Sequence, residues 1–95
     1  MAEEAYAYIV QCADGTYYTG WTCDVERRLA MHNRGRGAAY TRTRRPVRLV
    51  YAERLRSRSE AMRREHGLKR LSHADKARLI LRAQCSGEAL EGDSP

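Results

Sequence analysis

The chain has 95 residues, of which 42% are hydrophobic, and this size predicts a single domain over residues 1–84 followed by a polar, disordered tail over residues 85–95. No stretch approaches the roughly 18 consecutive apolar residues of a membrane span, and the start of the chain lacks the basic and apolar regions of a signal peptide, so we expect a cytoplasmic protein. The net charge of +6 favours nucleic acid as the partner, and three cysteines without CxxC spacing argue against a disulfide framework or a zinc site.

Residues 5–22 predict a β-hairpin, because two segments rich in strand-forming residues flank the turn sequence Ala-Asp-Gly. With a two-residue turn, Tyr8 and Tyr18 would lie on opposite faces of the hairpin. With a three-residue turn that ends in a left-handed Gly15, Tyr8 would lie opposite Gly20 and both tyrosines would share one face. The residue pattern leaves both turns open.

Asp24 is the predicted N-cap of a helix that runs to about Asn33. In this helix Arg28 and His32 are four residues apart on the apolar stripe, so both side chains should lean inward. Residues 34–45 then predict a basic loop with glycine hinges.

A third strand is predicted over residues 47–53, followed by two helices. Ser57 and Glu60 form a capping box, in which the Glu60 side chain should return to the Ser57 amide, and this helix should run to about Arg70. Ser72 begins a weaker capping box that predicts the last helix.

The positive charge is concentrated between Arg27 and Arg70, where fourteen Arg and one Lys against three carboxylates give a local charge of +12. Such a surface would bind a polyanion, and an acid that survives in it is a candidate for a structural or metal-binding role. Glu65 is that candidate, because it lies on the helix stripe that should face the sheet, and a half-buried carboxylate needs a cation beside it. An arginine or a single hydrated Mg²⁺ or Mn²⁺ could be that cation. His66 and His73 show no partner pattern, and we expect both at the surface.

Four of the six tyrosines lie in the predicted hairpin. Strand propensity and packing are sufficient reason for any one of them, whereas a tyrosine beside cations could act as a general base. Arg28 offers a guanidinium for a scissile phosphate, and His32 offers an imidazole for proton transfer or phosphate contact. Two-metal sites fit poorly, because they usually need several convergent Asp or Glu side chains.

Taken together, these residues resemble the GIY-YIG endonucleases, and the later part of the chain looks like their small stand-alone bacterial branch. The resemblance covers roughly residues 5–82. The motifs that carry it are Tyr6-Ala7-Tyr8, Tyr18-Thr19-Gly20, Asp24 with Arg28, Gly37-Ala38-Ala39-Tyr40-Thr41-Arg42, Arg45-Pro46-Val47, Leu49-Val50-Tyr51, and Glu65 with Lys69. Two features depart from the family: Tyr6 replaces the opening Gly of the first motif, and no clear equivalent is found of the Asn that closes the pocket in larger members.

The resemblance implies an α/β (α+β) fold, with a three-stranded antiparallel sheet flanked by helices, and it favours the three-residue turn. It also implies metal-dependent hydrolysis of a DNA phosphodiester with inversion at phosphorus. Either Tyr8 or Tyr18 would activate the water, and Arg28 would stabilise the pentacovalent phosphate. Glu65 would hold one Mg²⁺ or Mn²⁺, and His32 lies where some members have a further histidine.

DNA recognition would fall to the Arg-rich loop and the faces around it, and the branch makes single-stranded or branched DNA, as in repair or recombination, the plausible target. The residues that we expect to contact nucleic acid are Arg27, Arg34, Arg36, Tyr40, Thr41, Arg42, Arg44, Arg45 and Lys69. The alternative is a basic nucleic-acid-binding module without turnover, which fits the charge equally well. A membrane-surface role is a distant third, because the helices lack a broad apolar face opposite the arginines. We expect a monomer.

Overall fold

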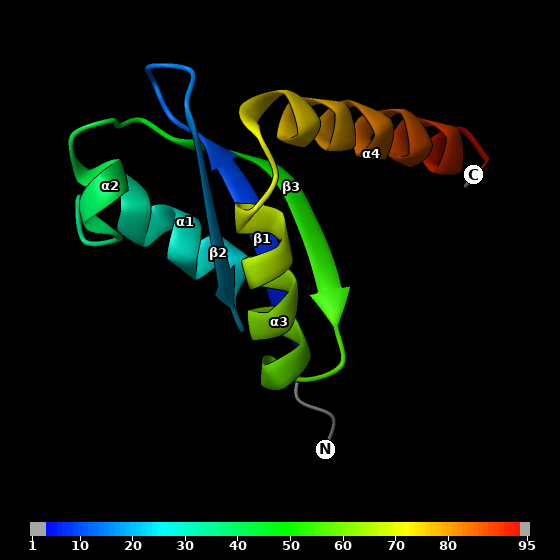
Figure 1. Ribbon diagram of the computed structural model, residues 1–95, viewed down its shortest axis with the longest axis horizontal. Coiled ribbons are helices and arrows are strands. Elements are labelled where there is room, and N and C mark those ends of the chain that lie inside the picture. The colour runs from blue at the N-terminus through cyan, green and yellow to red at the C-terminus, as the bar shows by residue number, and fades with distance from the viewer. Residues whose placement is uncertain (1–3, 94–95) are drawn as a thin grey trace.

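The computed structural model describes residues 4–93 of the chain and the side chains of residues 4–85. It contains a three-stranded antiparallel sheet with helices around it (Figure 1). The elements are, in chain order, β1 (Ala5–Gln11), β2 (Tyr17–Thr22), α1 (Val25–Asn33), α2 (Ala39–Arg42), β3 (Arg48–Leu55), α3 (Arg58–Lys69) and α4 (His73–Asp93). The strand order is β2-β1-β3, so β1 is the central strand and β2 is an edge strand. The α+β fold class expected from the sequence is therefore confirmed.

The hairpin of β1 and β2 has the three-residue turn. The Gly15 amide donates to the Cys12 carbonyl over 2.9 Å, and Gly15 has a φ of +86°, a left-handed value that favours glycine. In the resulting register Tyr8 lies opposite Gly20, and Tyr18 shares the face of Tyr8. The two-residue alternative is wrong, and both motif tyrosines point to the same side of the sheet.

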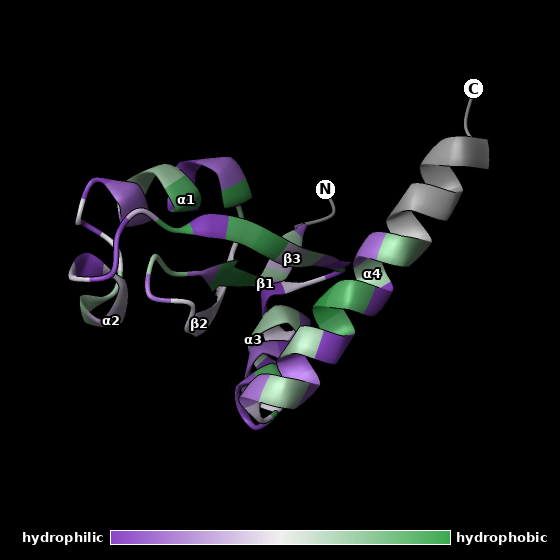
Figure 2. Ribbon diagram, turned by 90° about the horizontal axis from the view of Figure 1, so that it is seen from above, coloured by the Kyte–Doolittle hydropathy of each residue, from purple (hydrophilic) through white to green (hydrophobic). Residues whose placement is uncertain are grey.

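Helices α1 and α3 lie on opposite faces of the sheet (Figure 2). Successive side chains of β1 point to these two faces in turn, and each face has its own buried residues. The core on the α1 face consists of Tyr8, Val10, Cys12 and Val47, with Tyr18 and Leu29 packed against it. The buried residues on the α3 face are Ala5, Ala7 and Ile9 of β1, together with Ala61 and Leu68 of α3. Because both faces of β1 are covered, a slip of its register would expose one of these two sets.

Two helix starts follow the caps that the sequence predicted. The Asp24 carboxylate accepts from the Arg27 amide over 3.1 Å at the start of α1. The Ser57 hydroxyl accepts from the Glu60 amide over 3.1 Å at the start of α3. The Glu60 carboxylate returns to the amide of Arg56 over 3.0 Å, and not to that of Ser57 as expected. The capping box is therefore present, but it is one residue wider on the acidic side.

The basic segment predicted as a loop over residues 34–45 contains the short helix α2. Just after this segment, Val47 is hydrogen-bonded to Asn33 at the end of α1. The Asn33 side-chain amide donates to the Val47 carbonyl over 3.0 Å, and its oxygen accepts from the Val47 amide over 2.7 Å. One side chain thus satisfies both backbone groups of Val47, the residue just before β3. Strand β3 starts just after this contact, at Arg48, and ends at Leu55, two residues later than predicted.

Helix α4 starts as predicted, with the Ser72 hydroxyl accepting from the Asp75 amide over 3.1 Å. His73 is exposed, as predicted, but it also stacks on Tyr17 of β2 with ring centroids 4.5 Å apart, a contact that its sequence pattern did not indicate. Its Nε2 also lies 3.3 Å from the carbonyl oxygen of Gly15. His73 therefore connects the start of α4 to the hairpin.

The backbone of α4 extends to Asp93, through most of the segment that we expected to be disordered, and residues 94–95 lie outside the described part of the chain. Ile80 is buried, whereas the neighbouring Leu81 is 62% exposed. His66 of α3 is exposed, as predicted. None of the described helices is long and apolar enough to cross a membrane.

Candidate active site

The centre of the candidate site is a buried pair of a tyrosine and a histidine. Tyr8 comes from the central strand β1 and is 2% exposed, and His32 comes from the last turn of α1 and is fully buried. The Tyr8 hydroxyl and the His32 Nε2 share a hydrogen bond of 2.9 Å. Two residues that are 24 positions apart in the sequence therefore meet because α1 packs its inner stripe on the sheet.

Two glycines leave the room for this pair. A Cβ atom at Gly20 would lie 2.6 Å from the Tyr8 hydroxyl oxygen, so the Tyr8 ring can lie across β2 only because residue 20 has no side chain. A Cβ atom at Gly37 would overlap the Nδ1 atom of His32. With the three-residue turn, the sequence already places Tyr8 opposite Gly20. That pairing was the signal that could have revealed the need for glycine at position 20.

On its other side, His32 contacts the basic segment. Its Nδ1 and the Thr41 hydroxyl share a hydrogen bond of 2.8 Å, and the Thr41 hydroxyl donates to the Ala38 carbonyl over 3.0 Å. Thr41 is fully buried. Its prediction as a nucleic-acid contact is therefore wrong, because its side chain cannot reach a ligand on the surface.

Tyr18 lies on the other side of the same imidazole. Its ring meets the His32 ring edge-on, with centroids 5.4 Å apart and planes at 64°. Unlike Tyr8, Tyr18 is partly exposed. Both motif tyrosines thus contact one histidine, and only Tyr18 is open to solvent.

Arg28 lies one helical turn before His32, and its charge acts on both members of the buried pair. Burial raises the pKa of Tyr8, and the nearby Arg28 guanidinium opposes that rise. Burial lowers the pKa of His32, and the same guanidinium lowers it further. The Nε atom of Arg28 is buried and has no hydrogen-bond partner among the described residues. Because Nε itself is buried, an incoming oxygen would reach it only after the partly exposed Arg28 side chain shifts.

Glu65 reaches the site from α3, on the opposite face of the sheet. Its side chain is 16% exposed and pairs with Lys69 over 3.1 Å, so the expected cationic partner is a lysine one turn along the helix. The Glu65 carboxylate is close enough to Tyr8 to contribute to the raised pKa of that residue. Lys69 lies 5.9 Å from the centroid of the Tyr18 ring. Glu65 and Lys69 of α3 therefore each lie near one of the two motif tyrosines.

The residues present could hold a divalent ion only together with oxygen ligands from a bound substrate. No group of three or more His, Cys, Asp or Glu side chains in the described part of the chain could hold a metal ion alone. Mg²⁺ commonly keeps several waters and binds through one or two carboxylates together with substrate phosphates. Glu65 can provide the one carboxylate, once Lys69 has moved away from it.

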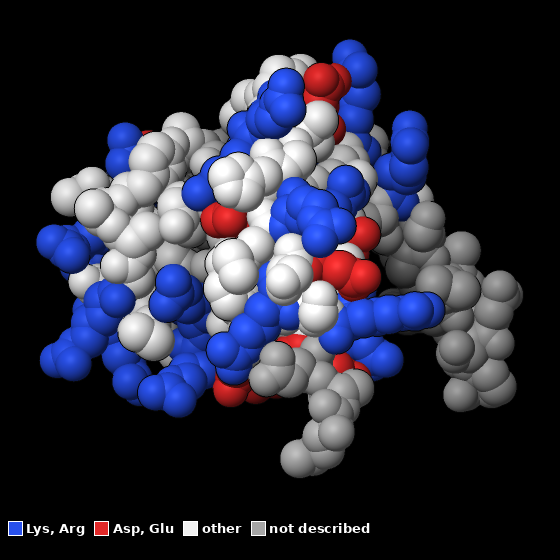
Figure 3. Space-filling model, turned by 60° about the horizontal axis from the view of Figure 1, so that its bottom comes forward, with Lys and Arg blue, Asp and Glu red and all other residues white. Residues whose placement is uncertain are grey.

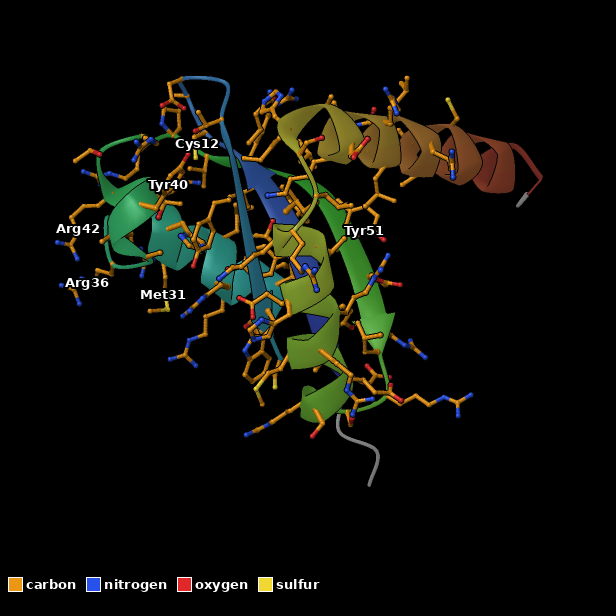
Figure 4. All side chains as sticks on the ribbon, in the orientation of Figure 1. Cys12, Met31, Arg36, Tyr40, Arg42 and Tyr51 are labelled. Atoms are coloured by element: carbon orange, nitrogen blue, oxygen red, sulfur yellow. The ribbon has the colours of Figure 1, made fainter. Side chains whose placement is uncertain are left out.

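The predicted nucleic-acid arginines divide into two groups. In the first group the guanidinium is exposed and makes no hydrogen bond or ion pair with the described residues; its members are Arg27, Arg34, Arg36 and Arg42. Arg36 and Arg42 point away from the body of the molecule (Figure 4). Basic side chains lie on the side of the molecule where α1 and α2 are found, and also across the rest of the face in view (Figure 3). These four arginines are available to a polyanion.

The second group is bonded within the protein. Arg44 pairs with Asp14 over 3.1 Å, donates to the Tyr40 carbonyl over 2.7 Å and covers the Tyr40 ring at 3.9 Å from its centroid. Arg45 donates to two backbone carbonyls of the neighbouring turns, over 2.9 and 3.3 Å. Tyr40 also stacks on Tyr18, with centroids 6.0 Å apart. Tyr40 itself is 38% exposed, whereas Arg44 and Arg45 are bonded within the segment and shape it more than they offer contacts.

Comparison with known proteins gives a consistent result. A family model described as the GIY-YIG catalytic domain matches residues 4–78. The UPF0213 protein of Natronomonas pharaonis is 56% identical over 80 residues, which cover 84% of this chain and 94% of that protein. The UPF0213 protein of Staphylococcus haemolyticus is 56% identical over 75 residues, which cover 79% of this chain and 92% of that protein. The branch that we expected to be bacterial thus also occurs in archaea.

Two solved structures show the same fold. The solution NMR structure of the UPF0213 protein of Bacillus halodurans aligns with a TM-score of 0.52 at 48% identity, and covers 81% of this chain and 82% of that one. The solution NMR structure of a protein of E. faecalis aligns with a TM-score of 0.58 at 38% identity, and covers 90% of this chain and 93% of that one. The sheet and helices described above are therefore shared with relatives of similar length.

Proposed function

Because the chain belongs to the GIY-YIG nuclease family, we propose that it is an endonuclease that hydrolyses DNA phosphodiester bonds with one divalent metal ion. The observation that carries the proposal is that two tyrosines and a guanidinium lie around one buried imidazole, and that the Glu65 carboxylate lies near enough to Tyr8 to act on its pKa. These groups can supply proton transfer, charge stabilisation and a metal ligand, which are the functions that phosphodiester hydrolysis needs.

Tyr18 is our candidate for the general base. It is partly exposed, so an attacking water can approach its hydroxyl, whereas Tyr8 is 2% exposed and already shares a hydrogen bond with His32. For this role Tyr18 first loses its own hydroxyl proton to solvent. Its phenolate would then accept the water proton while the water oxygen forms a bond to phosphorus opposite the leaving oxygen. The bond from phosphorus to the leaving sugar oxygen then breaks, and that oxygen takes a proton from solvent. This course inverts the configuration at phosphorus.

Arg28 is our candidate for stabilising the phosphate. Negative charge on the phosphate oxygens increases in the transition state, and a donor that is already fixed in place stabilises it most. The guanidinium of the partly exposed Arg28 is our candidate for such a donor, and its contact with the Tyr8 oxygen keeps it from turning to solvent. Arg28 should therefore affect the rate of cleavage more than the affinity for DNA.

Glu65 is our candidate metal ligand. A bound Mg²⁺ or Mn²⁺ would supply positive charge to the phosphate oxygens. For this role Glu65 has to exchange its 3.1 Å contact with Lys69 for the cation. The released ammonium of Lys69 would remain beside Tyr18, where it could contact a phosphate of the bound strand.

We assign the substrate to single-stranded or branched DNA, of the kind met in repair or recombination. The support is the set of four unpaired arginines around α1 and α2, which offer phosphate contacts along one side of the site. Arginine contacts to phosphate position a nucleic acid without reading its bases, so these side chains would recognise backbone and shape. A binding module without turnover would use the same arginines, and cleavage separates the two possibilities.

The experiment is a cleavage screen of the purified protein on single-stranded, nicked, flap and junction DNA with Mg²⁺ or Mn²⁺. The Glu65→Gln variant is compared with Glu60→Gln, which changes a carboxylate of the same helix. Glutamine can also fill the third position of a capping box, so Glu60→Gln should keep the fold.

We expect the parent and Glu60→Gln to cut at least one of these substrates, and Glu65→Gln to bind it without cutting. If no substrate is cut with either ion while binding is retained, the protein is the binding module. If Glu65→Gln cuts as fast as the parent, the metal assignment is wrong.

A further inference from the structure

The buried hydrogen bonds behind the candidate active site end at Thr41, a residue to which the nuclease proposal gives no task. Thr41 is fully buried, and its hydroxyl lies between the Ala38 carbonyl oxygen and the Nδ1 atom of His32. It donates to the Ala38 carbonyl over 3.0 Å, and it is 2.8 Å from the Nδ1 of His32. On the far side of the imidazole, Nε2 is 2.9 Å from the Tyr8 hydroxyl. The four groups form one continuous chain from a backbone carbonyl to the active-site phenol.

The directions of the other hydrogen bonds in this chain follow from the bond between Thr41 and Ala38. In the structure the Thr41 hydroxyl donates its single hydrogen to the Ala38 carbonyl, which also accepts from the Thr41 and Arg42 amides. The Thr41 oxygen must then accept from His32, which places a hydrogen on Nδ1. A neutral imidazole has one such hydrogen, so Nε2 is an acceptor and the Tyr8 hydroxyl donates to it.

The neutral form of His32 is the one that this burial favours. Burial lowers the pKa of His32, and the positive charge of Arg28 lowers it further. A charged imidazole would present hydrogens on both nitrogens, and Nε2 could then no longer accept from Tyr8. The neutral state and the bond directions are therefore consistent with each other.

We propose that Thr41 is a positioning residue that fixes His32 in the tautomer protonated at Nδ1. This tautomer makes Tyr8 a hydrogen-bond donor, and it leaves the lone pairs of the Tyr8 oxygen for the guanidinium of Arg28. The inference rests on the proposed function for its effect on catalysis, since Arg28 is the residue that would bind the phosphate.

The opposite tautomer would have an unfavourable consequence. With a hydrogen on Nε2, His32 would donate to the Tyr8 oxygen, and the Tyr8 hydrogen would turn toward Arg28. Two donors would then face each other, and the guanidinium would move from its place. Thr41 thus acts on Arg28 through two intermediates and touches no substrate itself.

The local sequence gives this contact its space. A Cβ at Gly37 would overlap the Nδ1 of His32, so the segment can approach the imidazole closely only with glycine at this position. The short helix α2 then places Thr41 one turn after Ala38, with the Thr41 amide 3.2 Å from the Ala38 carbonyl oxygen. The segment from Gly37 to Thr41 therefore closes the back of the site.

The experiment compares Thr41→Val, which keeps the shape and loses the hydroxyl, with Thr41→Ser, which keeps the hydroxyl. The ¹⁵N chemical shifts of the His32 imidazole in labelled protein report which nitrogen carries the hydrogen. We expect Nδ1 to be protonated in the parent and in Thr41→Ser, and Nε2 to become protonated in Thr41→Val. A parent protonated at Nε2, or a Thr41→Val variant with the tautomer of the parent, overturns the proposal.

The second readout is single-turnover cleavage. Thr41→Val should slow cleavage by about 10- to 100-fold, the usual effect of removing an outer hydrogen-bond partner, while DNA affinity stays the same and Thr41→Ser restores the rate. A tautomer change without a slower rate contradicts the proposal. If the parent cuts no substrate, the proposed function fails, but the tautomer still tests Thr41. If Thr41→Val does not fold, the tautomer of the parent decides.

Discussion

At the scale of single residues, the candidate site depends on two positions without a side chain. The Tyr8 hydroxyl lies against Gly20, and the His32 ring lies against Gly37, each closer than a Cβ atom would allow. Neither glycine is needed there for a left-handed backbone, since the described glycines with positive φ are Gly15 and Gly35. Close contact, and not backbone conformation, is therefore the reason for glycine at positions 20 and 37.

The first prediction concerns Gly20→Ala. The new methyl group would meet the Tyr8 hydroxyl at 2.6 Å, so the core must shift, and overpacking of this kind typically costs about 1–3 kcal/mol. The matched control is Gly67→Ala, because a Cβ there meets no atom within 4 Å and the position is inside helix α3. The control should stabilise the protein by about 0.5–1 kcal/mol. Urea unfolding measures both, and equal midpoints for Gly20→Ala and the parent would contradict the account.

The second prediction concerns pH and His32. The folded-state pKa of His32 is below its ordinary value of 6.5, so below pH 6.5 the unfolded chain binds a proton that the folded chain does not. The free energy of unfolding should therefore fall as the pH drops from 6.5 to the folded pKa, by at most about 1.4 kcal/mol per pH unit. Above pH 6.5 this contribution should be constant.

The check on this prediction removes the imidazole. In His32→Gln, the part of the slope of unfolding free energy against pH that comes from proton binding by His32 should be lost. Denaturant unfolding at several pH values between 5 and 8 gives the slopes. A parent slope that survives in His32→Gln would show that His32 is not held neutral.

At the scale of elements, the helix starts and the hairpin could be predicted because their signals are local. The side chains of Asp24 and Ser57 each accept from the backbone amide three residues later and so cap the start of a helix. Gly15 ends the turn that the sequence suggested. The choice between the two turns needed the family resemblance, because the residue pattern allowed both. The predicted partner of the Glu60 carboxylate was wrong by one residue, because this long side chain can reach either of two adjacent amides.

The elements that escaped prediction depend on distant partners. Helix α2 has no side-chain cap and lies in a segment of glycines and arginines, so its sequence resembles a loop. The role of Thr41 depends on His32, nine residues earlier, and its neighbours suggested a basic surface instead. His73 finds its partner Tyr17 on another element altogether. Tertiary packing, and not propensity, decides these three cases.

The third prediction concerns Asn33, which connects α1 to the start of β3. Asn33→Ala would leave both the amide and the carbonyl of Val47 without this partner, which should cost on the order of 2–3 kcal/mol. The amide hydrogen of Val47 should also exchange faster than in the parent. The exchange rates of amides in the middle of β1 should change only as far as the free energy of global unfolding changes. Unchanged exchange at Val47 would mean that another group replaces the side chain.

At the scale of the whole molecule, the positive charge has two separate tasks. Arg44 and Arg45 bond to groups of the protein, whereas Arg36 and Arg42 have no such partner in the described part of the chain. The concentration of arginines could be predicted from the sequence, but this division could not, because it depends on which carbonyls and carboxylates lie nearby. A cytoplasmic location and a monomeric state stay predictions.

The fourth prediction concerns salt. Each phosphate contact that is lost should reduce the slope of log affinity against log salt by about 0.7 for single-stranded DNA. Arg36→Gln and Arg42→Gln should each reduce this slope and leave the thermal stability unchanged. Arg45→Gln should mainly lower the stability, because it loses two internal hydrogen bonds. Salt titrations of DNA binding, with thermal melts alongside, would contradict the division if Arg45→Gln gave the larger change in slope.

The most direct test of the central claim, that the tyrosines, Arg28 and Glu65 form one hydrolytic site, compares two adjacent arginines. Arg28 has its Nε buried beside Tyr8, whereas Arg27 is exposed and unpaired in the described part of the chain. The measurement is the single-turnover cleavage rate at saturating DNA for Arg28→Gln and Arg27→Gln. We predict that Arg28→Gln loses about 10²- to 10³-fold in rate with nearly unchanged affinity, and that Arg27→Gln loses affinity but keeps the rate. An Arg28→Gln variant that cuts saturating DNA as fast as the parent would contradict the account.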